Sequence, residues 1–90
     1  MTMRAGILLF GGVEIDDAGS GPPASTDRRY DNDAVWHATE RLVDAGLTAE
    51  RLGYDSYWLT EHHFQYEGYE VVPNGLMLGA IIAERTARIR

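Results

Sequence analysis

The sequence contains no cysteine, which excludes disulfide bonds, zinc–thiolate sites and thiol nucleophiles. It also contains no lysine, because all eight basic residues are arginine, and the phosphate-binding P-loop motif cannot form without lysine. Those eight basic residues are outnumbered by fourteen acidic ones, and the net charge of −6 has the wrong sign for binding phosphate backbones. We therefore expect neither an ordinary P-loop nucleotidase nor a nucleic-acid partner.

Long apolar runs are absent as well. None approaches the length of a membrane span, and the N-terminus lacks the basic, apolar and small-residue regions of a signal peptide. Ninety residues, of which 44% are hydrophobic and 24% charged, can form no more than one small globular domain. We expect a cytoplasmic protein with no membrane partner.

The first apolar run, residues 5–10, ends at two glycines. A continuous run of this length predicts a strand buried on both faces, as in parallel sheets. The chain from Gly11 to Arg29 is polar and rich in glycine and proline, which predicts a long surface loop.

Helical spacing begins after Tyr30, where any of three residues could cap the first turn. Gly46 interrupts the pattern and leaves open two shorter helices, and Gly53 stands where a left-handed residue ends a helix. The candidate caps are Asp31, Asn32 and Asp33. The apolar stripe of the predicted helix consists of Val35, Ala38, Leu42, Ala45, Ala49 and Leu52. The opposite face is expected to be exposed to solvent and consists of Glu40, Arg41, Asp44, Glu50 and Arg51.

A second strand is predicted over residues 56–60, followed by Glu61-His62-His63 and a mixed loop over residues 65–72. A second helix is expected to open at Pro73 and Asn74. Its expected sheet-facing row is Leu76, Ala80, Ala83 and Ala87, with Met77 and Ile81 beside it. Residues 87–90 resemble a turn and the first steps of a third strand.

Alternating strands and helices predict an α/β fold with parallel pairing. Two strands and two helices leave a sheet edge and much of a sheet face open, so a domain of this size alone is unfavourable. We therefore expect the chain to be the N-terminal part of a larger α/β protein.

Glu61, His62 and His63 follow the carboxyl end of the second predicted strand, where α/β folds place their functional sites. Histidine suits general acid/base catalysis because it titrates near neutral pH. Neighbouring residues of a strand point to opposite faces, so His62 and His63 cannot both point the same way unless the strand has already ended, and one of them is expected to face the site. The alternatives are hydrogen bonding to neighbouring loops and a metal site, for which adjacent histidines have poor geometry; we expect no metal.

Other residues are weaker candidates for a functional role. Val13 and Asp16 stand where a dinucleotide-binding fingerprint needs glycine, so a Rossmann domain is disfavoured. His37 is expected to be a surface residue of the first helix. The aromatic side chains after the histidines could line a substrate pocket or pack on one another; they are Phe64, Tyr66 and Tyr69.

Two segments together resemble the N-terminal region of bacterial luciferase-like flavin-dependent monooxygenases. Residues 52–64 read LGYDSYWLTEHHF, and residues 79–90 read GAIIAERTARIR after Pro73. The resemblance implies the N-terminal βαβα portion of a (β/α)8 TIM barrel, incomplete in this chain. Residues 1–90 would be about the first quarter of that single domain.

The resemblance also implies a function. Members bind reduced FMN at the barrel mouth and oxidise small organic substrates with O2, and relatives use a deazaflavin coenzyme for hydride transfer. His62 matches the family's acid/base residue near the flavin, His63 is the weaker catalytic candidate, and Glu61 matches the residue beside the ring. A flavin reductase and a homo- or heterodimer are the implied partners, and a non-catalytic barrel subunit is a further alternative.

The chain departs from many family members in its longer segment from Gly11 to Arg29, which leaves the substrate open. The family's phosphate-binding residues lie beyond Arg90. A chain of these ninety residues is therefore expected to be inactive by itself.

Overall fold

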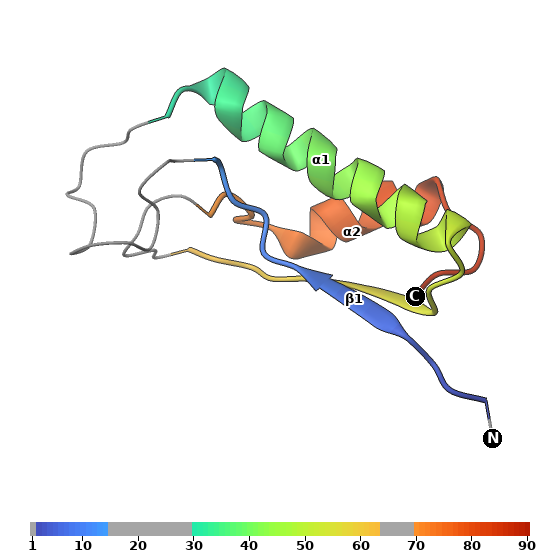
Figure 1. Cartoon of the computed structure of the whole chain (residues 1–90). Helices are drawn as coiled ribbons and strands as arrows, with labels where there is room; N and C mark the ends of the chain where they lie inside the picture. The colour runs from blue at the N-terminus through green and yellow to red at the C-terminus, as the bar shows by residue number, and fades with distance from the viewer. Residues whose placement is uncertain (1, 15–29, 64–69) are drawn as a thin grey trace.

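The structure, a computed structural model, describes residues 2–14, 30–63 and 70–90. Its elements are β1 (Gly6–Leu9), α1 (Asn32–Arg51), β2 (Ser56–Leu59) and α2 (Gly75–Glu84). This order is the predicted one, and β1 and β2 pair in parallel from Gly6↔Ser56 to Leu9↔Leu59. Both helices lie on the same face of the sheet (Figure 1). The described residues therefore form a small α/β unit of two layers.

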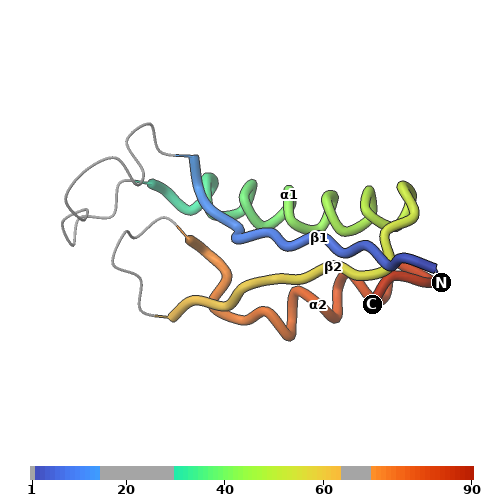
Figure 2. The backbone as a smooth tube through the Cα atoms, turned by 60° about the horizontal axis from the view of Figure 1, so that its bottom comes forward, coloured from blue at the N-terminus to red at the C-terminus, as the bar shows by residue number. Residues whose placement is uncertain are grey.

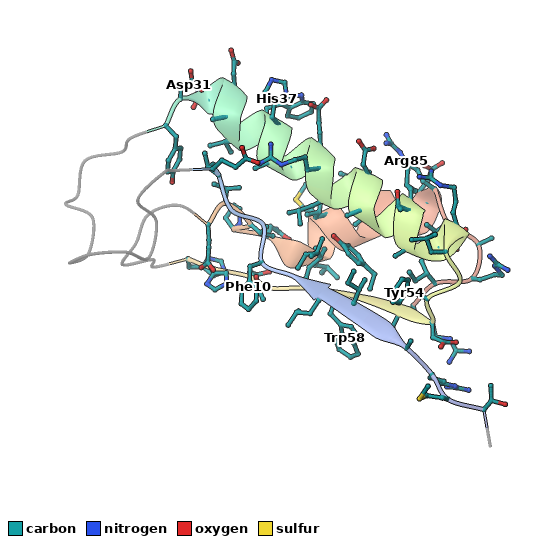
Figure 3. All side chains as sticks on the ribbon, in the orientation of Figure 1. Phe10, Asp31, His37, Tyr54, Trp58 and Arg85 are labelled. Atoms are coloured by element: carbon teal, nitrogen blue, oxygen red, sulfur yellow. The ribbon has the colours of Figure 1, made fainter. Side chains whose placement is uncertain are left out.

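The prediction that the first strand is buried on both faces is wrong for the described part of the chain. Along β1, exposed and partly buried residues alternate. Leu8 is 50% exposed and Phe10, just beyond the strand, is 56% exposed, as is Trp58 on β2 at 62%. Because both helices cover one face, the second apolar face of this sheet is left open (Figure 3).

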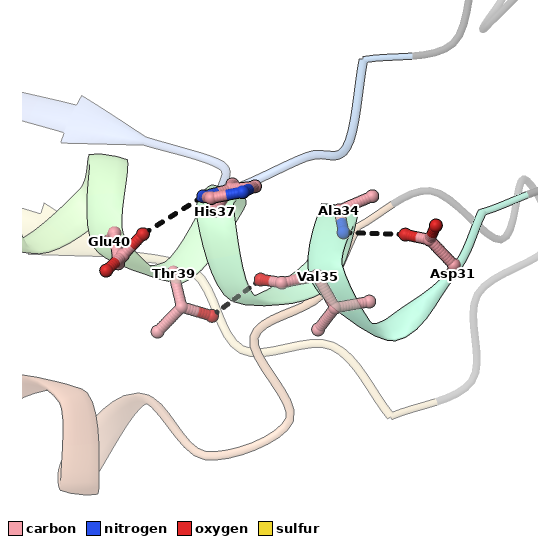
Figure 4. Close-up of polar contacts among 6 residues, drawn as sticks. All are labelled: Asp31, Ala34, Val35, His37, Thr39 and Glu40. Atoms are coloured by element: carbon pink, nitrogen blue, oxygen red, sulfur yellow. Dashed lines mark hydrogen bonds and ion pairs between the residues drawn. The ribbon is translucent and has the colours of Figure 1, made fainter.

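Helix α1 begins as the sequence predicted. Asp31 is its N-cap, and the Asp31 carboxylate accepts a hydrogen bond of 2.8 Å from the Ala34 N–H (Figure 4). The segment forms one continuous helix of 20 residues, and not two shorter helices that meet at Gly46. Gly46 is buried there, and a Cβ atom at this position would lie 2.9 Å from Ile82 and 3.3 Å from the Tyr57 ring. The glycine allows the helix to approach the sheet and α2 closely.

The core lies between the helices and the sheet. The apolar stripe predicted for α1 is largely confirmed, except that Leu52 is 71% exposed because it caps the helix end. Tyr57 ties β2 to α1, since its hydroxyl donates to the Leu42 carbonyl at 3.0 Å, and burial raises the pKa of Tyr57 to about 12. The central cluster consists of Leu42, Val43, Val72, Leu78 and Ile82.

Helix α2 presents a different face to the core from the predicted one. Asn74 caps it as expected, accepting from the Met77 N–H at 3.0 Å, but its buried residues are Leu78 and Ile82. The row that was expected to cover the sheet is exposed, with Leu76 at 84%. Because residues 75–83 are nearly all apolar, spacing alone could not distinguish the inner face. Neither helix of the described residues is both long and apolar enough to cross a membrane.

Glu50 does not belong to the solvent face where the sequence analysis placed it. Its carboxylate accepts hydrogen bonds from the backbone N–H groups of Ala87, Arg88 and Ile89 at 2.8–3.0 Å. These bonds lower the pKa of Glu50, with Ile89 the largest contributor. The same N–H groups are then not available to extend α2, which ends at Glu84 rather than at Ala87.

The last residue pairs with the sheet. Arg90 donates its N–H to the Asp55 carbonyl at 3.1 Å and accepts from the Tyr57 N–H at 2.8 Å, which is the pattern of parallel pairing. This agrees with the expected first step of a third strand. Figure 2 shows both ends of the chain at the amino end of the sheet.

Two glycines with positive φ provide a matched stability test. A Cβ atom at Gly53 (φ 85°) would have no neighbouring atom within 4 Å, whereas a Cβ at Gly11 (φ 68°) would lie 2.6 Å from both Leu42 and Val72. We expect Gly53→Ala to cost about 1–2 kcal/mol of unfolding free energy through backbone strain alone. Gly11→Ala should cost about 1–3 kcal/mol more through overpacking, measured by urea unfolding. Equal losses in the two variants would contradict the tight contact at Gly11.

Candidate functional site

The predicted site residues lie just beyond the carboxyl end of β2. The strand ends at Leu59, so Glu61, His62 and His63 are outside regular strand geometry. The Thr60 hydroxyl donates to the Phe10 carbonyl at 3.2 Å, which places this segment beside the end of β1. The strict alternation of neighbouring side chains therefore no longer applies to the two histidines.

His62 is held by both its backbone and its ring. Its N–H donates to the Val72 carbonyl at 2.9 Å, and its Nδ1 lies 3.0 Å from Oε2 of Glu70. The two side chains are 30% and 12% exposed. The other ring nitrogen, Nε2, is buried and has no hydrogen-bond partner among the described residues. A buried polar atom without a protein partner is uncommon and marks a position where a bound molecule can supply one.

Glu61 and His63 form a second pair, with Oε1 of Glu61 2.6 Å from Nε2 of His63. Oε2 of Glu61 accepts from the Gly75 N–H at 2.7 Å, at the start of α2. The hydrogen bond from His63, followed by that from Gly75, lowers the pKa of Glu61. Each histidine therefore contacts a different carboxylate, and Glu61 is kept charged at the edge of the site.

Glu70 was missed by the sequence analysis, which placed it in a mixed loop. It lies at an isolated antiparallel bridge with Gly12, next to the Val71 N–H that donates to the Gly11 carbonyl at 2.9 Å. An acidic residue in an irregular loop has no periodicity that could associate it with His62, eight positions earlier. Only the folded backbone places the two side by side.

An open apolar surface leads toward this edge of the sheet. Leu8 and Trp58 are paired in register, and Phe10 lies on the same side, facing away from both helices (Figure 3). All three are at least half exposed. In the described residues, the face of the sheet opposite the helices is therefore apolar and open.

Two other features are separate from these histidine–carboxylate pairs. His37 is a surface residue as expected, with a side chain 64% exposed and Nδ1 3.1 Å from the Glu40 carboxylate (Figure 4). A cavity of about 500 Å³ lies at the opposite, amino end of the strands, with Arg4, Asp55 and Trp58 among its lining residues. We place the candidate site at the carboxyl end, where the histidine–carboxylate pairs are.

Within residues 2–14, 30–63 and 70–90 there is no group of three or more histidine, aspartate or glutamate side chains arranged to hold a metal ion. The aromatic candidates Phe64, Tyr66 and Tyr69 lie outside the described residues.

Comparison with models of known protein families shows which family the chain belongs to. The family model for luciferase-like monooxygenases matches residues 3–90. The chain belongs to the luciferase-like monooxygenase family. Searches among curated proteins and among solved structures each found no match.

Membership places the chain in a family whose members are generally monooxygenases or other oxidoreductases and commonly use flavin or deazaflavin cofactors. The predicted resemblance is thereby confirmed, and the strand–helix–strand–helix order is consistent with part of a luciferase-like fold.

The Glu61–His63 pair predicts a specific pH dependence. A carboxyl group whose pKa is lower in the folded state stabilises the fold above its unfolded pKa, and this stabilisation is lost as the pH falls through the lowered pKa. In His63→Ala the largest cause is removed, so the pKa of Glu61 should rise toward the ordinary glutamate value. Carboxyl-detected NMR titration measures it.

The matched control for this titration is His37→Ala, which removes an exposed histidine from Glu40 and should leave the titration of Glu61 unchanged. An unaltered Glu61 midpoint in His63→Ala would show that the pair does not form in solution.

Proposed function

We propose that this protein is a flavin-dependent monooxygenase that oxidises a small organic substrate with reduced FMN and O2. The observation that carries the proposal is the family match over residues 3–90, which includes Glu61-His62-His63 at the carboxyl end of a parallel strand. Sites in parallel α/β folds are built at that end. In this proposal His62 is the acid/base group near the flavin.

Two described groups at the carboxyl end suit contacts to a flavin ring. Phe10, which is 56% exposed beside Thr60, offers an apolar side chain to a flat aromatic system, and the buried Nε2 of His62 can bind a polar atom at its edge. Reduced flavin, when bound, supplies the electrons that activate oxygen. The Glu61 side chain is 45% exposed and charged, which suits the proposed position beside the ring.

The proposed role of His62 is proton transfer. Its side chain is mostly shielded from water, and it is tied to the backbone of Val72 and to the Glu70 carboxylate. A fixed imidazole in a shielded position can donate or accept a proton at a defined atom, while competing reaction with water is reduced. His63 has its Nε2 engaged by Glu61, which supports its lesser role.

We further propose that residues 1–90 are the N-terminal quarter of a single (β/α)8 barrel. The open sheet face and the parallel pairing of Arg90 with β2 support continuation of the sheet. A cytoplasmic location, a flavin reductase that supplies reduced FMN, and a dimeric barrel belong to the same proposal. The chain of ninety residues alone is expected to be inactive.

The test uses the complete gene product with reduced FMN, O2 and a panel of aldehydes and sulfonates. His62→Ala should lower turnover by roughly 10²- to 10⁴-fold, the range for loss of a general acid or base. Binding of reduced FMN, measured by fluorescence quenching, should change little. Oxygen uptake coupled to product formation is the measurement.

His37→Ala is the matched control, because it removes an exposed histidine of α1 that pairs with Glu40 rather than with Glu61 or Glu70, and it should retain full turnover. Unchanged turnover in a folded His62→Ala protein would remove the acid/base assignment. Oxygen-independent turnover with a reduced deazaflavin, and none with FMN, would replace the monooxygenase proposal by a hydride-transfer reaction.

A further inference from the structure

The His62–Glu70 pair differs from the other two histidine–carboxylate pairs in the described residues. In the Glu61–His63 pair and the His37–Glu40 pair, both side chains are about half exposed. In the His62–Glu70 pair, the glutamate is 12% exposed and the histidine 30%. A charge-assisted hydrogen bond is stronger and geometrically better defined where water competes less for its partners.

The chemistry of the pair determines where the His62 ring carries its proton. An ionised carboxylate only accepts hydrogen bonds, so the Nδ1 atom that lies 3.0 Å from Oε2 of Glu70 must be the donor. In the neutral ring the other nitrogen, Nε2, then bears the lone pair. Nε2 is the buried nitrogen without a hydrogen-bond partner among the described residues.

His63 provides the contrast. It uses Nε2 to contact Glu61, whereas the Nε2 of His62 has no hydrogen-bond partner among the described residues. Of the two adjacent histidines, only His62 combines a largely shielded carboxylate on Nδ1 with an Nε2 that has no hydrogen-bond partner among the described residues. The geometry therefore distinguishes two residues that the sequence motif treats almost alike.

Backbone contacts also hold the segment that carries Glu70. Segment 70–72 bridges Gly12 through Glu70, donates from Val71 to the Gly11 carbonyl, and accepts at Val72 from the His62 N–H. Val72 is 4% exposed and belongs to the core. The carboxylate is thus carried by a segment that is hydrogen-bonded to the ends of both strands.

We propose that Glu70 is a positioning residue that holds His62 in the Nδ1–H tautomer and directs Nε2 to the reacting group. This inference rests on the proposed function for its catalytic consequence. When Nε2 accepts a proton from a substrate O–H or N–H group, the bonding electron pair stays on the substrate atom. The imidazolium so formed keeps Nδ1–H on Glu70, whose negative charge stabilises it without taking the proton.

The first experiment reads the tautomer and needs no activity. In ¹⁵N-labelled protein at a pH where the imidazole is neutral, two-bond ¹H–¹⁵N spectra should show His62 with widely separated nitrogen shifts and the proton on Nδ1. In Glu70→Ala these shifts should move toward those of free histidine, which favours the Nε2–H form. Glu70→Gln should retain the wild-type pattern, because its amide oxygen can still accept from Nδ1.

Glu40→Gln is the matched control, since it alters the exposed His37 pair of the same Nδ1 geometry and should leave His62 unchanged. Wild-type His62 with the Nε2–H pattern, or Glu70→Ala with the wild-type pattern, overturns the proposal. A protein in which all three described histidines give the spectrum of free histidine overturns it as well.

The second experiment measures turnover in the complete gene product. Glu70→Ala should lower kcat by roughly 10- to 100-fold, the usual effect of removing an orienting partner, with little change in KM, and Glu70→Gln should restore part of it. Unchanged kcat in Glu70→Ala overturns the positioning role. If wild-type protein shows the fixed tautomer but no flavin-dependent oxidation, the proposed function fails while the assignment of Glu70 to His62 stands.

Discussion

The carboxyl ends of two parallel strands are held together by the backbone of residues 70–72, and the candidate site depends on this constraint. β1 and β2 are short, and their pairing ends at Leu9↔Leu59. Beyond that point, segment 70–72 hydrogen-bonds to Gly11 on one side and to His62 on the other. Val72 carries the same segment into the core between the helices. Core packing and site geometry are therefore coupled through one stretch of backbone.

The site itself consists of two histidine–carboxylate pairs with different surroundings. Glu61 is an exposed carboxylate that also accepts from the first N–H of α2, so it connects the motif to a helix. Glu70 is largely shielded from water and contacts the more buried histidine of the motif. The two adjacent histidines thus have different surroundings, because each ring contacts a different carboxylate. Membership in the luciferase-like monooxygenase family gives this arrangement its chemical context.

Much of the fold could be predicted because its signals are local. Asp31 and Asn74 are capping residues whose side chains bond within three positions, and Gly53 adopts the positive φ expected after a helix. Failures occurred where the deciding contact is distant. Glu50 bonds to residues 87–89, and α2 turns Leu78 and Ile82 inward, although nearly all its residues are apolar. Neither the partners of Glu50 nor the inner face of α2 can be predicted from residues within one turn of the helix.

The sequence by itself determined the order of the elements, their caps, and the place of Glu61, His62 and His63 after a parallel strand. These follow from spacing and from residue types that act over a few positions. Only the tertiary structure decided that Glu70 lies against His62, that His63 pairs with Glu61, and which nitrogen of each ring is engaged. The physical reason is that ring orientation depends on hydrogen-bond partners brought together by chain folding, and such partners leave no periodic pattern along the chain.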